Sequence, residues 1–238
     1  MNKRIARCIA IQNRRGVPMS VCVIGAEKGG VGKSTLTENA AAIRAEVGYR
    51  VVIADFDNQG TCSKWISRRE EHPDLAKIAV RRLRKEDRGN LRAFGELVQE
   101  LVDSYDDVLI DVGGQDTGIF RAALAVADKV IVPLTPSPDD LDTVPDLADI
   151  VRRFDKPLDI RIVLNMTSGQ PTMLKSMKKG LEGFSDVLPL MPKMIGTRVA
   201  FKYAKNKGQG VAELSKADGY DPHAANEMKD FYLGVFGK

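Results

Sequence analysis

Blocks of apolar positions alternate with amphipathic blocks along the chain, which predicts strands and helices in turn. The apolar runs are short and uninterrupted, as in strands that are buried on both faces of a sheet. They occupy residues 19–24, 50–54, 108–111, 129–133 and 160–165. Because predicted helices lie between these runs, we expect an α/β fold in which a mostly parallel, twisted sheet carries helices on both faces.

The predicted helices occupy residues 34–47, 91–102, 117–127, 140–154, 171–183, 199–207 and 222–236. Gly48 ends the first helix, since glycine readily adopts the left-handed conformation that follows a helix. The charged stretch 66–95 predicts a short strand near 78–83 between solvated helices, and 187–192 predicts a short strand or extended edge. No internal repeat or low-complexity linker divides the chain. We therefore expect a basic N-terminal extension, possibly a mobile arm, at residues 1–18, followed by one domain at 19–238.

The composition is that of an ordinary soluble protein, with 43% of the 238 residues hydrophobic and 29% charged. No apolar run approaches the ~20 residues that span a bilayer, and the N-terminus lacks the cleavage site of a secretory signal. We therefore expect a cytoplasmic location. Three cysteines and two histidines are too dispersed for a zinc site or a disulfide framework. The net charge of +4 alone predicts no nucleic-acid surface.

A glycine-rich loop with the sequence KGGVGKST lies between the first predicted strand and the first predicted helix. Glycines let the backbone turn its N–H groups toward a phosphate, and the N-terminus of the following helix adds further donors. Lys33 can reach the β- and γ-phosphates, and the Ser34 hydroxyl can ligate Mg²⁺. The alternative is a glycine-rich surface turn beside a basic helix. Such a turn would not require eight consecutive residues to match a phosphate-loop motif between a strand and a helix, so the phosphate loop is the better interpretation. The predicted nucleotide-binding residues are Lys28, Gly29, Gly30, Val31, Gly32, Lys33, Ser34 and Thr35.

Aspartates follow two other predicted strands. Asp55 begins the sequence DFDNQG after the strand 50–54, and Asp111 ends the strand 108–111. An acid at the end of an apolar strand is typical of a Walker B motif, so we expect Asp111 to hold Mg²⁺ through a water and Asp55 to lie near the ion. A strand end of this composition can also be a simple turn, but the phosphate loop makes a magnesium site the better interpretation.

These motifs resemble the ParA/MinD superfamily of ATPases with a deviant Walker A motif, KGGxGK[ST]. Glu27 occupies the position of the usual first glycine, and Lys28 is the additional lysine. The resemblance covers residues 21–213 and is closest to small ParA-like partition ATPases without an N-terminal helix-turn-helix domain. It implies a P-loop NTPase fold, ATP and Mg²⁺ as cofactors, slow ATP hydrolysis and an ATP-dependent homodimer.

The resemblance also implies roles for individual residues. Lys28 would reach across the dimer to the partner's phosphates, Lys33 would contact the bound phosphates, and Asp57 would orient the attacking water. Asn58 stands where the family usually has proline, which leaves the rigidity of this loop open. For adenine, Asn165 matches an asparagine that ends a later strand in the family, and the loop at Pro192 is a second candidate wall. An asparagine in an ordinary loop explains Asn165 equally well.

A ParA-like protein would bind non-specific DNA in its ATP state, associate with the nucleoid, and leave the DNA when a ParB-like partner stimulates hydrolysis. Clustered lysines and arginines in the last third of the chain could contact DNA phosphates. They could equally be solvated helix faces. The candidate DNA-binding residues are Lys175, Lys178, Lys179, Arg198, Lys202 and Lys205.

The alternative function is a MinD-like ATPase that cycles on membranes or positions protein clusters. Apolar residues recur at helical spacing near the C-terminus, at Met228, Phe231, Tyr232 and Val235. Few basic residues accompany them, whereas helices at a membrane surface usually carry several. We therefore expect this helix to pack on the core and expect no membrane partner.

Overall fold

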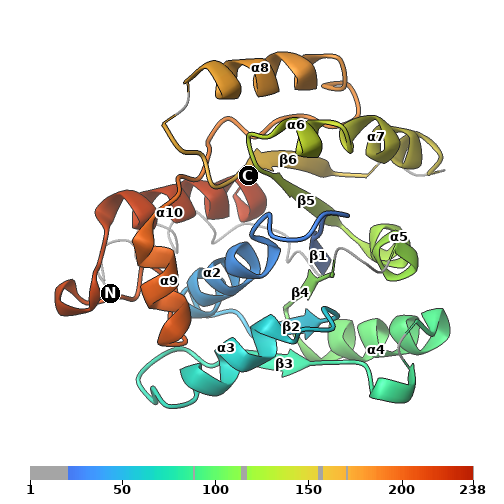
Figure 1. Cartoon of the computed structure of the whole chain (residues 1–238). Coiled ribbons are helices and arrows are strands. Elements are labelled where there is room, and N and C mark those ends of the chain that lie inside the picture. The colour runs from blue at the N-terminus through green and yellow to red at the C-terminus, as the bar shows by residue number, and fades with distance from the viewer. Residues whose placement is uncertain (1–20, 88, 114–116, 155–157, 170, 238) are drawn as a thin grey trace.

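The computed structural model describes residues 21–87, 89–113, 117–154, 158–169 and 171–237 (Figure 1). Within them, parallel strands form one six-stranded sheet in the order β3-β2-β4-β1-β5-β6. The strands are β1 (Val21–Ile24), β2 (Val51–Asp55), β3 (Ala79–Arg81), β4 (Asp107–Asp111), β5 (Lys129–Leu134) and β6 (Ile160–Leu164). The predicted basic extension, residues 1–18, lies outside the described residues.

Helices cover both faces of the sheet (Figure 1). The helices on one face are α2 (Lys33–Glu46), α3 (Thr61–Arg69), α9 (Val199–Asn206) and α10 (Pro222–Phe236). Those on the other face are α4 (Leu91–Ser104), α5 (Thr117–Val126), α7 (Val144–Arg152) and α8 (Pro171–Glu182). Shorter turns are α6 (Pro138–Leu141), η1 (Lys85–Asp87) and η2 (Lys216–Asp218). This arrangement confirms the predicted fold, a mostly parallel sheet with helices on both faces.

The apolar stripe of α10 is buried, as predicted. Met228, Tyr232 and Val235 are fully buried, and Phe231 is only 1% exposed. The stripe packs on the same core as Leu36 of α2, so this face of α10 is not available to a membrane. No helix in the described part of the chain has both the length and the apolar character needed to cross a bilayer.

Two helical segments differ from the prediction, and a third segment takes one of its two predicted forms. The helix predicted at 140–154 is broken between α6 and α7, because Pro145 cannot donate the backbone hydrogen bond that a continuous helix requires and is tolerated in the first turn of a new one. Residues 187–192, predicted as a short strand or an extended edge, form the extended edge: Leu190 makes a single bridge with Ile162, which exchanges backbone hydrogen bonds with Pro189 and Met191. In the charged stretch 66–95, the short strand predicted near 78–83 is β3. The helix before it was expected to be solvated, but α3 begins at Thr61 and buries Trp65 in the core.

The carboxyl ends of the central strands meet at one edge of the sheet. In the register of the sheet, Asp111 at the end of β4 lies level with Ile24 of β1 and with Asp55 of β2. Loops that leave parallel strands at this edge converge, which is where open α/β sheets bind their ligands. The glycine-rich loop after β1 is at the centre of this edge.

Candidate functional site

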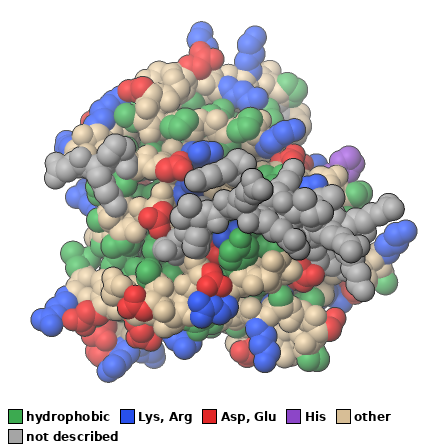
Figure 2. All heavy atoms as spheres, turned by 180° about the vertical axis from the view of Figure 1, so that it is seen from behind, with side chains coloured by type: hydrophobic (Ala, Val, Ile, Leu, Met, Phe, Trp, Pro, Cys, Tyr) green, Lys and Arg blue, Asp and Glu red, His purple; other side chains and the backbone are tan. Residues whose placement is uncertain are grey.

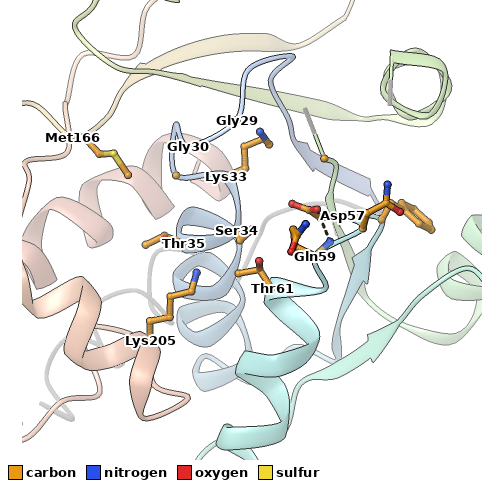
Figure 3. A pocket seen from close by; sticks show the side chains of 14 residues that line it. Gly29, Gly30, Lys33, Ser34, Thr35, Asp57, Gln59, Thr61, Met166 and Lys205 are labelled. Carbon is orange, nitrogen blue, oxygen red and sulfur yellow. Dashed lines mark hydrogen bonds between the residues drawn. The ribbon is translucent and has the colours of Figure 1, made fainter. Parts of the chain in front are cut away.

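The glycine-rich loop turns sharply into α2. Gly30 and Gly32 have φ angles of 80° and 92°, in the left-handed region that favours glycine. A side chain at Gly32 would also lie 2.2 Å from the Asn165 amide nitrogen. The loop borders a cavity of about 460 Å³, together with Lys33, Ser34 and other side chains shown in Figure 3. The amino end of α2 therefore opens into this cavity with its unpaired N–H groups, as an anion site requires.

Lys33 places a buried cation beside the loop. Its Nζ atom donates a hydrogen bond to the backbone oxygen of Lys28 at 2.6 Å, and the residue is only 6% exposed. Burial lowers the pKa of Lys33, while the carboxylates of Asp111 and Asp57 oppose this effect. An incoming phosphate would replace lost hydration of the ammonium group, so the site favours an anionic ligand.

Lys28 does not line this cavity. Its Nζ atom pairs with Asp140 Oδ1 at 2.8 Å and with Asp139 Oδ2 at 3.4 Å. Asp140 is buried and also accepts hydrogen bonds from the backbone and hydroxyl of Thr135. The hydrogen bond from Lys28 is the main reason that the pKa of the lysine is raised. The additional lysine is therefore bound to α6, the short helix that follows β5.

Two buried aspartates beneath the loop each have an oxygen without a hydrogen-bond partner among the described residues, Asp55 Oδ1 and Asp111 Oδ1. The other oxygen of Asp111 accepts from the Cys62 thiol at 3.1 Å, and that of Asp55 accepts from the backbone and hydroxyl of Ser63. Burial raises the pKa of Asp111 to about 6, although hydrogen bonds from Ser34 and Cys62 oppose the rise. A nearby cation would satisfy the free oxygens and stabilise both carboxylates.

The donor set suits Mg²⁺ bound together with a nucleotide. The described residues contain no group of three or more His, Cys, Asp or Glu side chains that could hold a metal ion without other ligands. Mg²⁺ usually keeps several waters and combines one or two protein oxygens with substrate phosphates. Ser34 and the free oxygen of Asp111 match this requirement.

Asp57 lines the same cavity from the loop after β2 (Figure 3). Its Oδ1 atom accepts a hydrogen bond from the backbone of Gln59 at 2.9 Å. Arg82, beyond β3, donates to the backbone oxygens of Asp57 at 2.7 Å and Asn58 at 3.3 Å. The loop that contains Asn58 is thus held from outside by an arginine.

Asn165 contacts the phosphate loop directly. Its Nδ2 atom donates to the backbone oxygen of Val31 at 2.8 Å, and the residue is buried. It also lines a second, more apolar cavity of about 230 Å³, with Met166 and Phe201. Pro192 is exposed and lines neither this cavity nor that at the loop. The structure thus places Asn165, but not Pro192, beside a cavity that could hold a base.

The candidate DNA-binding residues do not lie together in the protomer. Those of α8 are exposed, and α8 packs against α6. Those of the other group lie on or beside α9, which packs against α3 (Figure 1). Arg198 pairs with Glu227 and Asp221. Lys205 lines the cavity at the phosphate loop, whereas Lys202 lines the apolar cavity.

Sequence reasoning missed three contacts of this site: the Arg82 clamp, the partners of Lys28 on α6, and Lys205 in the cavity. No motif identifies them, because each depends on how distant segments meet. Thr61 also lines the loop cavity (Figure 3). Its position directly after the DFDNQG sequence was the one available signal for it.

Comparison with known proteins places the chain among ATPases. The family described as ATPase MipZ matches residues 20–153. The septum site-determining protein MinD of Synechocystis is 28% identical over 141 residues, which are 49% of this chain and 53% of that protein. The chromosome-partitioning ATPase Soj of Thermus thermophilus is 30% identical over 135 residues, 45% of this chain and 51% of that protein. The chain therefore matches about half the length of these relatives.

Solved structures support the fold over a longer span. Apo McdA of Cyanothece superposes with a TM-score of 0.71 and 17% identity, covering 91% of this chain and 99% of that one. At this identity the likeness concerns the fold alone. It extends the shared architecture beyond residue 153, to the segments that contain α8, α9 and α10.

Proposed function

Because the chain belongs to the MipZ family of ATPases, within the ParA/MinD superfamily, we propose that it is a nucleotide-operated switch. In this proposal it binds Mg²⁺-ATP at residues 28–35, dimerises around the nucleotide and hydrolyses ATP slowly. The observation that carries the proposal is the cavity itself, where the amino end of α2, the buried Lys33 ammonium and Ser34 come together. The buried Asp111 carboxylate, which has one free oxygen, lies directly behind Ser34.

The residues of the site have distinct tasks in this proposal. The backbone of the loop and Lys33 bind the phosphates, while Ser34 and Asp111 hold Mg²⁺, which neutralises charge on the transferred phosphoryl group. Asp57 orients the water that attacks the γ-phosphate. Lys28 leaves Asp140 and reaches the phosphates of the partner subunit, which couples nucleotide binding to dimerisation.

We place non-specific DNA binding on α8. Lys175, Lys178 and Lys179 are exposed, and none of them forms an ion pair with another described residue. Figure 2 shows Lys and Arg side chains projecting along the upper edge of the molecule, where α8 lies in Figure 1. Two copies of this helix in a dimer would double the basic surface. A role in partition also agrees with the name of the Soj relative, a chromosome-partitioning ATPase.

The first experiment measures binding to a duplex of arbitrary sequence with ATP and with ADP across a salt series. Asp57→Ala is used to hold the ATP state. We expect binding only with ATP, and a steep loss with salt because each neutralised phosphate releases counterions. Changing the three α8 lysines to alanine should flatten the slope of log K against log salt by about 0.9 for each lost contact. The matched control changes three other exposed lysines, Lys77, Lys85 and Lys216.

A second function, positioning of protein clusters or cycling on a membrane, is supported by the similarity to MinD. The two proposals differ in the DNA experiment. If ATP-dependent dimers form but bind no DNA at low salt, partition through DNA is refuted and the switch acts on another surface. Liposomes with anionic lipids would then test the membrane, although the buried stripe of α10 argues against that helix as an anchor.

A further inference from the structure

Lys205 lies where two cavities meet. One cavity contains the phosphate loop with Lys33 and Ser34, and the other is the apolar cavity beside Asn165. Three residues line both of them: Thr35, Met166 and Lys205. Figure 3 shows the Lys205 side chain extending from α9 toward Ser34, Thr35 and Thr61. The lysine therefore faces the passage between the two cavities.

The partner of Lys205 within the chain is a buried acid. Its Nζ atom lies 3.4 Å from Glu38 Oε1, and the Glu38 side chain is 1% exposed. That oxygen forms no hydrogen bond within the described chain, so the pair is an ionic contact of poor hydrogen-bond geometry. Burial raises the pKa of Glu38 to about 8; Lys205 and Arg68 oppose the rise, and Asp111 adds to it. Lys205 is partly exposed, at 31%, and has ammonium hydrogens available for a ligand.

The chemical character of the two cavities indicates which part of a nucleotide would lie beside Lys205. A nucleotide with its β- and γ-phosphates in the glycine-rich loop would extend its base toward the more apolar cavity, since bases stack and phosphates need charge. In this pose, the group at the passage between the cavities would be the α-phosphate with the adjoining ribose. A cation at this point would neutralise a charge that ATP and ADP share.

We propose that Lys205, held by Glu38, binds the α-phosphate of the nucleotide. This inference rests on the proposed function and adds a third lysine to the two of the phosphate loop. It also separates Lys205 from the DNA-binding surface to which sequence reasoning assigned it. The role requires binding only and no bond is made or broken at Lys205.

The test compares two variants that both lack the ion pair, Glu38→Gln and Glu38→Gln/Lys205→Met. Neither variant leaves an unpaired buried charge, so we expect both to fold. Circular dichroism verifies that they do. Dissociation constants for ATP and for ADP are measured with Mg²⁺ by titration of fluorescent analogues. We expect the double variant to bind both nucleotides about 10- to 100-fold more weakly, the usual effect of removing a hydrogen bond to a charged group.

Lys207→Met is the matched control. Lys207 lies at the end of the same helix, pairs with Asp218 on the surface and lines neither cavity, so its loss should change affinity less than 2-fold. Equal affinities of the two Glu38 variants would overturn the assignment, as would a loss for ATP without one for ADP. A loss of DNA binding at saturating ATP, with nucleotide affinity unchanged, would overturn it in favour of a DNA contact. If the unmodified chain bound neither nucleotide, the proposed function itself would fail.

Discussion

The ion pair between Arg44 and Asp107 fixes the phosphate-loop helix to the centre of the sheet. Arg44 belongs to α2 and Asp107 to β4, and their side chains are 4% and 2% exposed. Two hydrogen bonds join them, Nε to Oδ2 at 2.7 Å and Nη2 to Oδ1 at 3.2 Å. The guanidinium group also donates to the Tyr232 hydroxyl and lies 3.4 Å from the centroid of the Tyr49 ring.

We expect Arg44→Met to destabilise the protein by about 3 kcal/mol. Removing one partner of a buried pair costs about 3–5 kcal/mol, because the other charge is left without compensation. Burial already raises the pKa of Asp107, even with Arg44 beside it. Asp107 can therefore take up a proton when Arg44 is absent, which limits the loss to the lower end of the range. Replacing both residues, as Arg44→Met/Asp107→Leu, should recover most of the stability.

Urea unfolding measures these effects. Trp65 is the single tryptophan and is completely buried, so its fluorescence follows unfolding. With an m value of roughly 3 kcal/mol/M for a chain of this size, a loss of about 3 kcal/mol lowers the midpoint by about 1 M. The control is Arg50→Met, which removes the exposed Arg50–Asp106 pair and should leave the midpoint almost unchanged, because solvent screens exposed ion pairs. Equal midpoints for Arg44→Met and Arg50→Met would refute the reasoning.

Three further predictions concern the site. Gly32→Ala should weaken nucleotide binding at least 100-fold, because the residue has a φ of 92° and no room for a Cβ atom. The control is Gly29→Ala, since Gly29 has open space around it. This control should bind nucleotide with an affinity within about 10-fold of that of the unmodified chain. Arg82→Ala should lower turnover about 10-fold at unchanged ATP affinity by releasing the loop after β2, and an equal loss in Arg84→Ala would contradict this. Glu38 has a pKa raised from 4.5 to about 8 by burial, so its contribution to stability is complete below pH 4.5 and is lost as the pH rises toward 8. Between pH 4.5 and 8, the free energy of unfolding of the unmodified chain should fall by about 1.4 kcal/mol per pH unit relative to that of Glu38→Gln. If the two free energies of unfolding change in parallel with pH, the raised pKa of Glu38 is excluded.

Local pattern was sufficient to predict the strands of this fold. The apolar runs at 108–111 and 160–165 coincide with β4 and β6 to within a residue, because strands buried on both faces require uninterrupted apolar sequence. The glycine-rich loop was equally predictable, since the spacing of its glycines and lysines is typical of phosphate binding. Breaks within helices were less evident: Pro145 lies in the first turn of α7, although the surrounding pattern is helical on both sides.

The contacts that complete the site could not be predicted in this way. Lys202 and Lys205 look alike in sequence and lie on the same helix, yet the first is exposed and the second lines the cavity at the phosphate loop. The partner of Lys205, Glu38, is 167 positions away along the chain, and no periodicity relates the two. Arg82 likewise meets the Asp57 loop only because β3 pairs with β2 at the edge of the sheet.

The contact between Lys28 and Asp140 competes with the contact that Lys28 would make in the proposed dimer. On the proposed mechanism, Lys28 can serve a second subunit only after it leaves Asp140, whose buried carboxylate then keeps the hydrogen bonds from Thr135 alone. Subunit closure is thus an exchange of ionic partners, in which a phosphate must attract the lysine more strongly than a carboxylate does. A chain without nucleotide offers no such phosphate. In the proposed cycle, the side chain that joins two loaded subunits therefore also favours the separate state of empty ones.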